Sequence, residues 1–348
     1  MKSILPVLSP VLGTSIVLIG AGLLNAYTSY RFGLEGISSI RAGLILSGYY
    51  AGLVMGSLRC GQIVTNVGHI RAFAGFSAIA AASTLGHSVT SVYEIWFLLR
   101  MACGFSLAGI FVVAESWLNG TATPTNRGQL LAVYMVANQV GLVIGQAALA
   151  AVGEGVHLAF TLAGMAMAVA VVPVTLTKGP GPSIAGETRM PVRTLMGRAP
   201  LAFFTCLLSG WITNSLFAMG PMAGQSLGLS RGLVGLFMSM LVVGGSVAQW
   251  PIGRLSDRMR RGWVIAGCGA FLALFTAALS FFWQPHQAVA AAAIGMGAFA
   301  FVLYPLAISD ANDLLSSEEI LGASGGLVLA YSVGAVVGPI ATSLVMEA

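Results

Sequence analysis

Ten polar or aromatic side chains interrupt long apolar runs of this sequence and are candidates for binding a solute. Arg100 lies within one run, and the adjacent amides of Asn138 and Gln139 lie near the middle of another. An arginine within a membrane span costs at least about 2.5–3.5 kcal/mol, so such groups face a partner or a water-accessible interior. We expect the following residues to line an internal cavity: Asn25, Tyr49, Arg100, Tyr134, Asn138, Gln139, Trp211, Asn214, Tyr304 and Tyr331.

The chemistry of this set is binding and not catalysis. Phenols, amides and a single cation suit a small, moderately polar or amphipathic solute, or an anion attracted by Arg100. The sequence has no nucleophile–base pair, phosphate-binding loop or cluster of metal ligands, and its four cysteines stand singly. We therefore expect no enzyme activity and no bound cofactor or metal. Two alternative roles of Arg100 stay open, namely snorkelling to the membrane surface and pairing with Glu94.

A second group of residues is placed to open and close such a cavity. Glu115 lies towards the C-terminal end of its apolar run, where the helix dipole disfavours a carboxylate, so it needs a cation. Arg59, Arg71 and Arg127 are candidates for a state-dependent ion pair with it. A short basic connector at 253–261 supplies the remaining gating residues: Gly253, Asp257, Arg258 and Arg261.

The connector carries its own expectations. When the cavity closes on this side, Asp257 would cap the N-terminal end of the helix that begins near residue 128, where the dipole is positive. The neighbouring arginines would contact carboxylates or anionic lipid, at about 1 kcal/mol each near the surface. An acidic segment, which contains Asp310, Asp313, Glu318 and Glu319, is either a solvated loop or a partner for the basic loops as the gate closes.

The composition requires that most of the chain avoid water. Only 8% of residues are charged, 57% are hydrophobic and the mean hydropathy is +0.89, whereas soluble domains carry about 25% charge. A span needs about 20 apolar residues, and continuous runs indicate helices instead of a barrel. We expect an all-α membrane protein with eleven spans, at 8–30, 41–60, 72–90, 93–118, 128–152, 156–176, 200–223, 229–250, 262–282, 287–308 and 321–345.

The sixteen basic residues orient these spans. With the N-terminus in the cytoplasm, three arginines, Arg31, Arg41 and Arg231, lie outside and Arg100 lies within a helix. The other twelve lie in the cytoplasm: Lys2, Arg59, Arg71, Arg127, Lys178, Arg189, Arg193, Arg198, Arg254, Arg258, Arg260 and Arg261. Cytoplasmic loops carry the excess of basic residues, so this orientation is preferred. The net charge of +5 is therefore a topological signal, and no nucleic-acid binding is expected.

The sequence also repeats itself. A shift of 192 positions brings Gly36, Gly43 and Gly52 onto glycines at 228, 235 and 244, and a shift of 193 relates Gly141 and Gly145 to Gly334 and Gly338. Two copies of one unit are therefore expected. We divide the chain into a six-helix bundle at 1–176, a flexible cytoplasmic linker at 177–199 and a five-helix bundle at 200–348.

The connector Gly253–Arg261 reads G-x-x-x-D-R-x-x-R and resembles the signature loop of the major facilitator superfamily. Three further segments, Gln249-Trp250-Pro251, Glu115-Ser116-Trp117 and Asn126-Arg127-Gly128, resemble the bacterial YcaD-like branch of that family. The spacing of Arg100 with Gly104 and Gly109 is similar to a second motif, tied in the family to substrate or proton coupling. The first copy of the signature is degraded, since Thr65 stands at the position of Asp257. The second copy departs from the family pattern at one position, where Arg260 replaces the second glycine of the signature.

This resemblance implies twelve helices in two parallel-repeat halves, so a twelfth helix is apparently missing. It also implies a secondary transporter that exposes a central site to each side in turn. We expect a monomer in the bacterial cytoplasmic membrane, with a small-molecule substrate and protons as a possible coupling ion. The alternative is a non-transporting sensor or assembly factor on the same fold.

Overall fold

The computed structural model describes residues 8–122, 126–152, 156–177, 190–281 and 286–347, all of them in helices or short turns. The helices are α1 (Leu8–Leu34), α2 (Ser39–Val67), α3 (His69–Val89), α4 (Tyr93–Thr121), α5 (Arg127–Ala147) with a 3₁₀ turn η2 (Ala148–Ala150), α6 (Val156–Val169), α7 (Val171–Thr175), α8 (Val192–Arg198), α9 (Pro200–Ser226), α10 (Arg231–Arg258), α11 (Arg261–Phe281), α12 (His286–Ala300), α13 (Leu303–Leu314) and α14 (Ser317–Glu347).

Each of the eleven expected apolar runs corresponds to a helix or to a broken pair of helices. Ten of the described helical segments are long and apolar enough to cross a membrane, and α2 is the exception. This helix packs extensively against α4 and α14. Protein therefore covers much of its surface, which relaxes the need for apolar side chains facing lipid.

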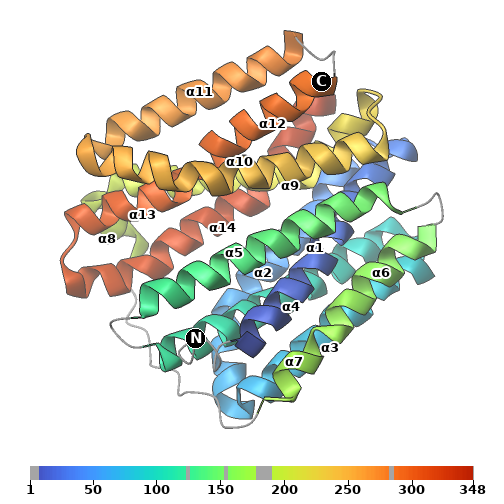
Figure 1. The fold of residues 1–348 in the computed structure, drawn as a ribbon, viewed down its shortest axis with the longest axis horizontal. Coiled ribbons are helices and arrows are strands. Elements are labelled where there is room, and N and C mark those ends of the chain that lie inside the picture. Colours follow the sequence, from blue (N-terminus) through green and yellow to red (C-terminus); the bar gives the residue numbers. More distant parts are fainter. Residues whose placement is uncertain (1–7, 123–125, 153–155, 178–189, 282–285, 348) are drawn as a thin grey trace.

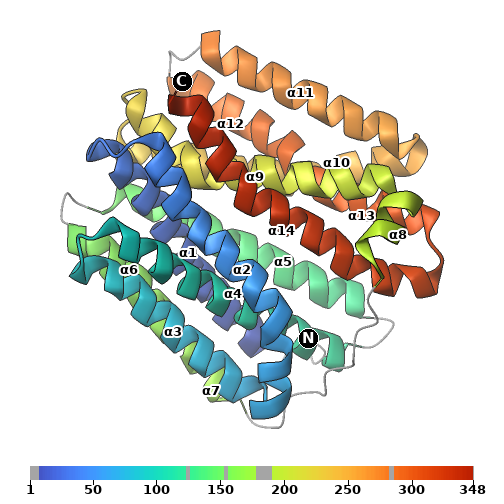
Figure 2. The same cartoon turned by 180° about the vertical axis from the view of Figure 1, so that it is seen from behind.

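The helices form two groups side by side, and both views show the same division (Figure 1, Figure 2). The first half contains α1 to α7 and the second contains α8 to α14. Contacts of α1 with α9, of α2 with α14 and of α5 with α10 join the halves. We call the two ends of the bundle the Leu8 end and the Leu34 end, after the residues at which α1 begins and ends.

Close helix crossings recur at matching positions in the two halves. A Cβ atom added at Gly145 would collide with the carbonyl oxygen of Ile19, and one at Gly338 would lie 2.6 Å from the carbonyl oxygen of Trp211. Trp211 follows Ile19 by 192 positions, so α5 crosses α1 as α14 crosses α9. Only a residue without a Cβ permits such an approach. The duplication in the sequence is thus a duplication of the packing.

The connector at 253–261 is mostly not a loop, which corrects the sequence prediction. Residues 253–258 continue α10, and only Met259 and Arg260 separate it from α11. The helix continues because its backbone N–H and C=O groups bond one another within the helix, whether the side chains face lipid or water. Polar side chains therefore mark where the helix leaves the apolar region and not where it ends. Gly253, Asp257 and Arg258 therefore lie on the last turns of α10, and Arg261 begins α11.

Two other segments depart from regular spans. The tenth run is broken into α12 and α13, two residues before Tyr304-Pro305. Proline lacks the N–H that would bond the residue four positions back, which is why it sits in the first turn of the new helix. Within the interval predicted as a flexible linker, α8 forms and packs on α9 and α14, with Leu195 fully buried.

Candidate substrate-binding site

Arg100 is buried within the first half. Its side chain is 1% exposed, and its Nη2 donates a 2.7 Å hydrogen bond to Oδ1 of Asn25. The guanidinium carbon lies 5.7 Å from the ring centroid of Tyr49. Among the described residues, Nε and Nη1 have no hydrogen-bond partner, and Glu94 pairs with Arg41 instead. Both alternatives for Arg100, snorkelling and pairing with Glu94, are therefore wrong.

A chain of phenols and one amide continues from Tyr49 into the second half. The rings of Tyr49 and Tyr50 are 5.2 Å apart, and the Tyr50 hydroxyl donates a 3.2 Å hydrogen bond to the carbonyl oxygen of Asn214. Nδ2 of Asn214 donates to the Tyr331 hydroxyl over 3.1 Å. The Tyr331 ring lies 4.9 Å from that of Tyr304. This chain brings together six of the predicted cavity residues: Asn25, Tyr49, Arg100, Asn214, Tyr304 and Tyr331.

The repeat shows which features of this chain the fold does not require. The position 193 residues after Arg100 is Ala293, which is fully buried between the equivalent helices of the second half. The same helix crossing therefore forms around an apolar residue. A buried cation is costly, and the buried alanine at the equivalent position shows that the packing of this crossing does not require one.

Tyr134 and Asn138 form a separate pair on α5. The Tyr134 phenol is 5% exposed and interacts with the side chain of Asn138, whose Oδ1 accepts a 3.4 Å hydrogen bond from Ser15 of α1. Both residues lie within the first half. No described contact joins them directly to the phenol chain, so the structure divides the predicted cavity residues into at least two groups.

Gln139 and Trp211 are half-buried, and neither side chain has a described hydrogen bond. Gln139 lies one turn before Val143, whose carbonyl oxygen accepts a 3.3 Å hydrogen bond from Ser239 of α10. It therefore occupies the face of α5 that meets the second half. The backbone of Trp211 lies at the close crossing with Gly338, so Trp211 is located where α9 contacts α14.

Glu115 is solvent-exposed, although it lies in one of the most buried helices. It forms no ion pair with any side chain that the structure describes, so the expected pairing with Arg59 or Arg71 is not present in this conformation. The side chain of Arg127 lies outside the described residues. The role of Glu115 in gating stays a prediction.

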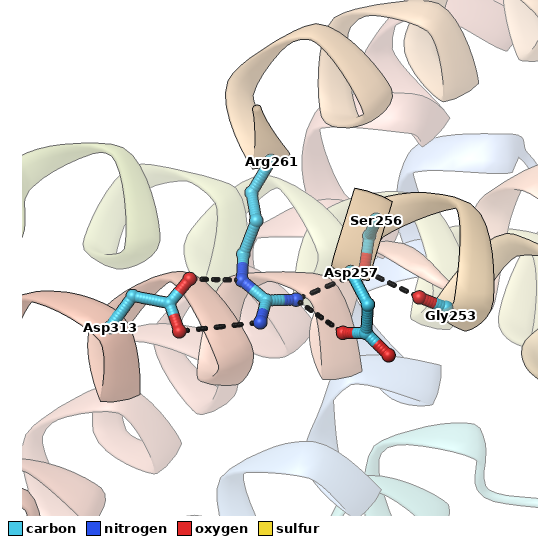
Figure 3. Close-up of polar contacts among 5 residues, drawn as sticks. All are labelled: Gly253, Ser256, Asp257, Arg261 and Asp313. Atoms are coloured by element: carbon cyan, nitrogen blue, oxygen red, sulfur yellow. Dashed lines mark hydrogen bonds and ion pairs between the residues drawn. The ribbon is translucent and has the colours of Figure 1, made fainter. Parts of the chain in front are cut away.

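Arg261 lies at the centre of a polar cluster that contains three of the predicted gating residues, Gly253, Asp257 and Arg261 itself (Figure 3). Its guanidinium binds the carboxylate of Asp313 on α13 through two nitrogens and donates to Oγ of Ser256 over 3.0 Å. Oδ1 of Asp257 lies 3.4 Å from its Nη1. Ser256 in turn donates to the carbonyl oxygen of Gly253 over 2.8 Å. All of these residues belong to one half, so Asp257 is held by Arg261 and not at the start of α5.

The acidic segment also pairs within its own half. Besides Asp313 with Arg261, Glu319 lies 3.5 Å from Arg198 at the end of α8. Hydrogen bonds from the backbone N–H and hydroxyl of Ser316, together with Arg198, lower the pKa of Glu319 below its ordinary value. The segment is therefore helical and partly paired. Glu318 lies outside the residues whose side chains are described.

Hydrogen bonds between the halves gather towards the Leu34 end. Besides the Tyr50–Asn214 bond, the backbone N–H of Ser39 donates to Glu347 over 2.7 Å, and that of Met222 donates to the Ser29 hydroxyl over 3.1 Å. Arg231 Nη1 donates to the carbonyl oxygen of Val152 over 2.7 Å. Between pairs of described residues, no hydrogen bond or ion pair joins the halves near the Leu8 end. The bundle is thus tied together at the Leu34 end.

Sequence reasoning missed three kinds of site residue. Tyr50 is adjacent to a predicted cavity residue, yet it makes the bond that crosses between the halves. His87 is 1% exposed and stacks on Phe160, with Nε2 unpartnered. Glu347 reaches the start of α2 from the far end of the chain. The spacing of residues in a helix indicates which face of the helix each residue occupies, but it does not identify a partner that is distant in the sequence. Nothing in the sequence around Glu347 therefore indicated its contact with Ser39.

Comparison with known proteins agrees with this architecture. The family model described as Major Facilitator Superfamily matches residues 8–339. An uncharacterized MFS-type transporter of Yersinia pestis (strain Pestoides F) is 30% identical over 344 residues, which are 98% of this chain and 89% of that protein. The uncharacterized MFS-type transporter YcaD of Escherichia fergusonii is 28% identical, with the same coverage.

Solved transporters have the same fold. A bacterial homolog of the human lysosomal transporter Spinster, in an inward-facing and unoccupied conformation, superposes with a TM-score of 0.78 and 14% identity, covering 97% of this chain and 81% of its own. The nucleoside transporter NupG gives a TM-score of 0.77 at 16% identity, covering 100% of this chain and 91% of its own. At such low identity the likeness concerns the fold alone.

Proposed function

This chain belongs to the Major Facilitator Superfamily, and from that premise we propose that it is a secondary transporter that moves a small solute across the bacterial cytoplasmic membrane by alternating access. The two halves rock about the residues between them and expose a central site to one side at a time. The observation that carries the proposal is the chain from Arg100 through Tyr49, Tyr50 and Asn214 to Tyr331, because it crosses from one half to the other at mid-membrane.

The state of the bundle supports this mechanism. Its halves are tied at the Leu34 end and share no described polar contact at the Leu8 end. We propose that the Leu8 end is cytoplasmic, since the basic residues gather there. The conformation is then inward-facing. Closure of the Leu8 end would move Asp257 to the start of α5 and release the contacts of Ser29 and Glu347.

The substrate that suits this chain of residues is small and moderately polar. Phenols and amides offer hydrogen bonds and ring faces while leaving the wall largely apolar. We propose that protons drive export, because intramembrane carboxylates serve as proton carriers in transporters and Glu115 is an exposed carboxylate on the predicted span α4. The protein would work as a monomer, in which each half supplies part of the site.

A thermal-shift screen of the purified protein against small metabolites and drugs tests the proposal and identifies candidates. Each stabilising compound is then tested for uptake by inverted proteoliposomes with and without an imposed proton gradient. Transport that requires the gradient supports proton-coupled export. Transport without it supports facilitated diffusion. Stabilisation by no compound, with no transport of any, contradicts the proposal and favours a sensor or assembly factor.

A matched pair of variants locates the site. Tyr331→Phe removes the hydroxyl that accepts from Asn214, and Tyr93→Phe removes a hydroxyl near the Leu34 end of α4, away from the chain. We expect the first variant to weaken the thermal shift of a hit and the second to leave it unchanged. Equal effects of the two would place the binding site elsewhere.

A further inference from the structure

Arginines and tryptophans form an exposed surface at the Leu8 end of α10 and the start of α11. The side chains of Trp250 and Trp263 are 66% and 69% exposed. Arg254, Arg258 and Arg260 are exposed as well. We call these five residues the Trp–Arg surface. It lies at the periphery of the second half, where α11 forms the edge of the bundle in both views (Figure 1, Figure 2).

One side of α10 carries most of this surface and faces lipid. Val247, Trp250, Arg254 and Arg258 follow one another at intervals of three or four residues, which places them on one side of the helix. Val247 is 70% exposed on a helix long and apolar enough to cross a membrane, whereas the side that includes Gly244 packs closely on α12. The two arginines therefore continue the side of α10 that meets lipid.

The length of α10 places these arginines beside the lipid headgroups. The helix has 28 residues and begins at Arg231, so it is about 42 Å long at about 1.5 Å per residue. The hydrocarbon core is about 30 Å thick, or about 20 residues, and counted from Arg231 it ends near Pro251. Trp250 lies at this boundary, where tryptophan is enriched in membrane proteins. Arg254 and Arg258 lie beyond it, in the headgroup layer.

Trp250 also holds the guanidinium of Arg254 in a fixed position. The guanidinium carbon lies 3.8 Å from the centroid of the Trp250 ring, which is within the range of a cation–π contact. Stacking uses a face of the planar guanidinium, whereas its hydrogen bonds are donated along the edge and match two oxygens of a phosphate. The contact therefore orients Arg254 for binding a phosphate group.

The described carboxylates nearest to this surface bind a different arginine. Arg261 pairs with both Asp257 and Asp313 (Figure 3). Arg254 and Arg258 stand four residues apart on one helix, where two like charges destabilise the helix slightly. An anion bound by both guanidinium groups would offset this repulsion.

The repeat shows that the fold does not require the two arginines. A shift of 192 positions relates Arg254 and Arg258 to Gln62 and Asn66 on the last turns of α2. Both of these side chains are exposed and uncharged. The same helix end therefore forms without the charges.

We propose that the Trp–Arg surface binds an anionic phospholipid, such as phosphatidylglycerol. The lipid phosphate accepts hydrogen bonds from Arg254 and Arg258, and an acyl chain lies along α10 against Trp250 and Val247. The remaining arginine and tryptophan of the surface extend it towards α11. A basic residue near an anionic membrane surface strengthens the attraction about fivefold. A phospholipid suits this surface because the arginines adjoin apolar side chains that lipid tails cover.

Quenching of tryptophan fluorescence by brominated lipids tests the site. The purified protein is reconstituted into phosphatidylcholine vesicles that contain a rising fraction of brominated phosphatidylglycerol or, in a parallel series, of brominated phosphatidylcholine. Comparison of the two titrations gives the preference for the anionic lipid around the tryptophans. The difference between wild type and the double variant Trp250→Phe/Trp263→Phe isolates the contribution of this surface.

A matched pair of double variants separates the site from general charge attraction. We expect wild type to prefer phosphatidylglycerol by about tenfold or more, and Arg254→Gln/Arg258→Gln to lose most of this preference, because each arginine contributes about fivefold. Arg59→Gln/Arg71→Gln removes two exposed arginines from the Leu8 end of the first half. It should leave the preference unchanged. All four arginines are exposed, so the melting temperatures should also stay unchanged.

Three results would overturn the proposal. The first is equal quenching by the two brominated lipids in wild type. The second is an equal loss of preference in both double variants, which would show attraction to the basic end of the bundle as a whole. The third is loss of the preference when inorganic phosphate is added at constant ionic strength, which would show a site for a soluble anion.

Discussion

The hydroxyl of Tyr50 in α2 donates a 3.2 Å hydrogen bond to the backbone carbonyl oxygen of Asn214 near the middle of α9, and so links the two halves. Asn214 uses its side chain to bind Tyr331 in the second half. One residue therefore connects the closure of the Leu34 end to the chain of polar residues that we assign to the solute. A solute that engages Tyr331 or Asn214 would act on the conformational equilibrium through this link.

Loss of the Tyr50 hydroxyl should favour opening of the Leu34 end. A net hydrogen bond contributes about 0.5–1.5 kcal/mol, so Tyr50→Phe should shift the equilibrium roughly two- to tenfold. Ser343→Cys is a reporter, because Ser343 is fully buried against Gly43 across the halves. We expect faster alkylation of this cysteine by an impermeant maleimide. Tyr27→Phe, which alters a buried phenol within the first half, should leave the rate unchanged.

Glu347 should act as a latch at the Leu34 end. Its carboxylate accepts the backbone N–H of Ser39 at the positive end of the α2 dipole, over 2.7 Å. Such an interaction is worth about 0.3–1 kcal/mol at an exposed site and is screened by salt. Glu347→Gln should raise alkylation of the Ser343→Cys reporter by up to about fivefold, and high salt should reduce the difference. Glu94→Gln breaks an ion pair inside one half and should change neither the alkylation rate nor its salt dependence. Equal effects of Glu347→Gln and Glu94→Gln would count against the latch.

Arg100 should be required for transport and not for folding. Replacing a buried ion pair by apolar residues of similar volume is often neutral or stabilising, by about 1–4 kcal/mol, and no described carboxylate pairs with Arg100 that its loss would leave buried and unpaired. Arg100 is buried with two unpartnered nitrogens, and its counterpart is Ala293. We expect Arg100→Met to keep or raise the melting temperature while transport falls. A large drop in melting temperature would show instead that Arg100 holds the helices of the first half together.

Asp257 should stabilise only the conformation in which the Leu8 end is closed. Here its side chain is 69% exposed and lies 3.4 Å from Arg261, so its removal should cost less than about 1 kcal/mol of stability. If it caps α5 when the Leu8 end closes, Asp257→Ala weakens that state and slows alkylation of the Ser343→Cys reporter. Thr65→Ala alters the equivalent, uncharged position of the first copy and serves as the control. Wild-type alkylation in Asp257→Ala would remove the capping role.

The sequence predicts the fold in more detail than it predicts the site. Apolar runs and repeated glycines depend on local composition and spacing, and Gly145 and Gly338 do make the close crossings that their repetition indicates. The sequence predicts a connector at 253–261 because polar residues are typical of loops, whereas the backbone continues as a helix and α10 ends at Arg258. The partners of Arg100 and Glu347 were not predictable, since residues 75 and 308 positions distant supply them.

In a transporter of this kind the two halves alternate between two arrangements. Spin labels at Val92 and Leu227 report the distance between halves at the Leu34 end, and labels at Val67 and Met259 report it at the Leu8 end; all four side chains are exposed. Electron–electron double resonance on these two pairs, in liposomes with and without a proton gradient, measures both distances. We predict two populations at each end that change in opposite directions. A single, unchanged distance at both ends under all conditions would contradict alternating access.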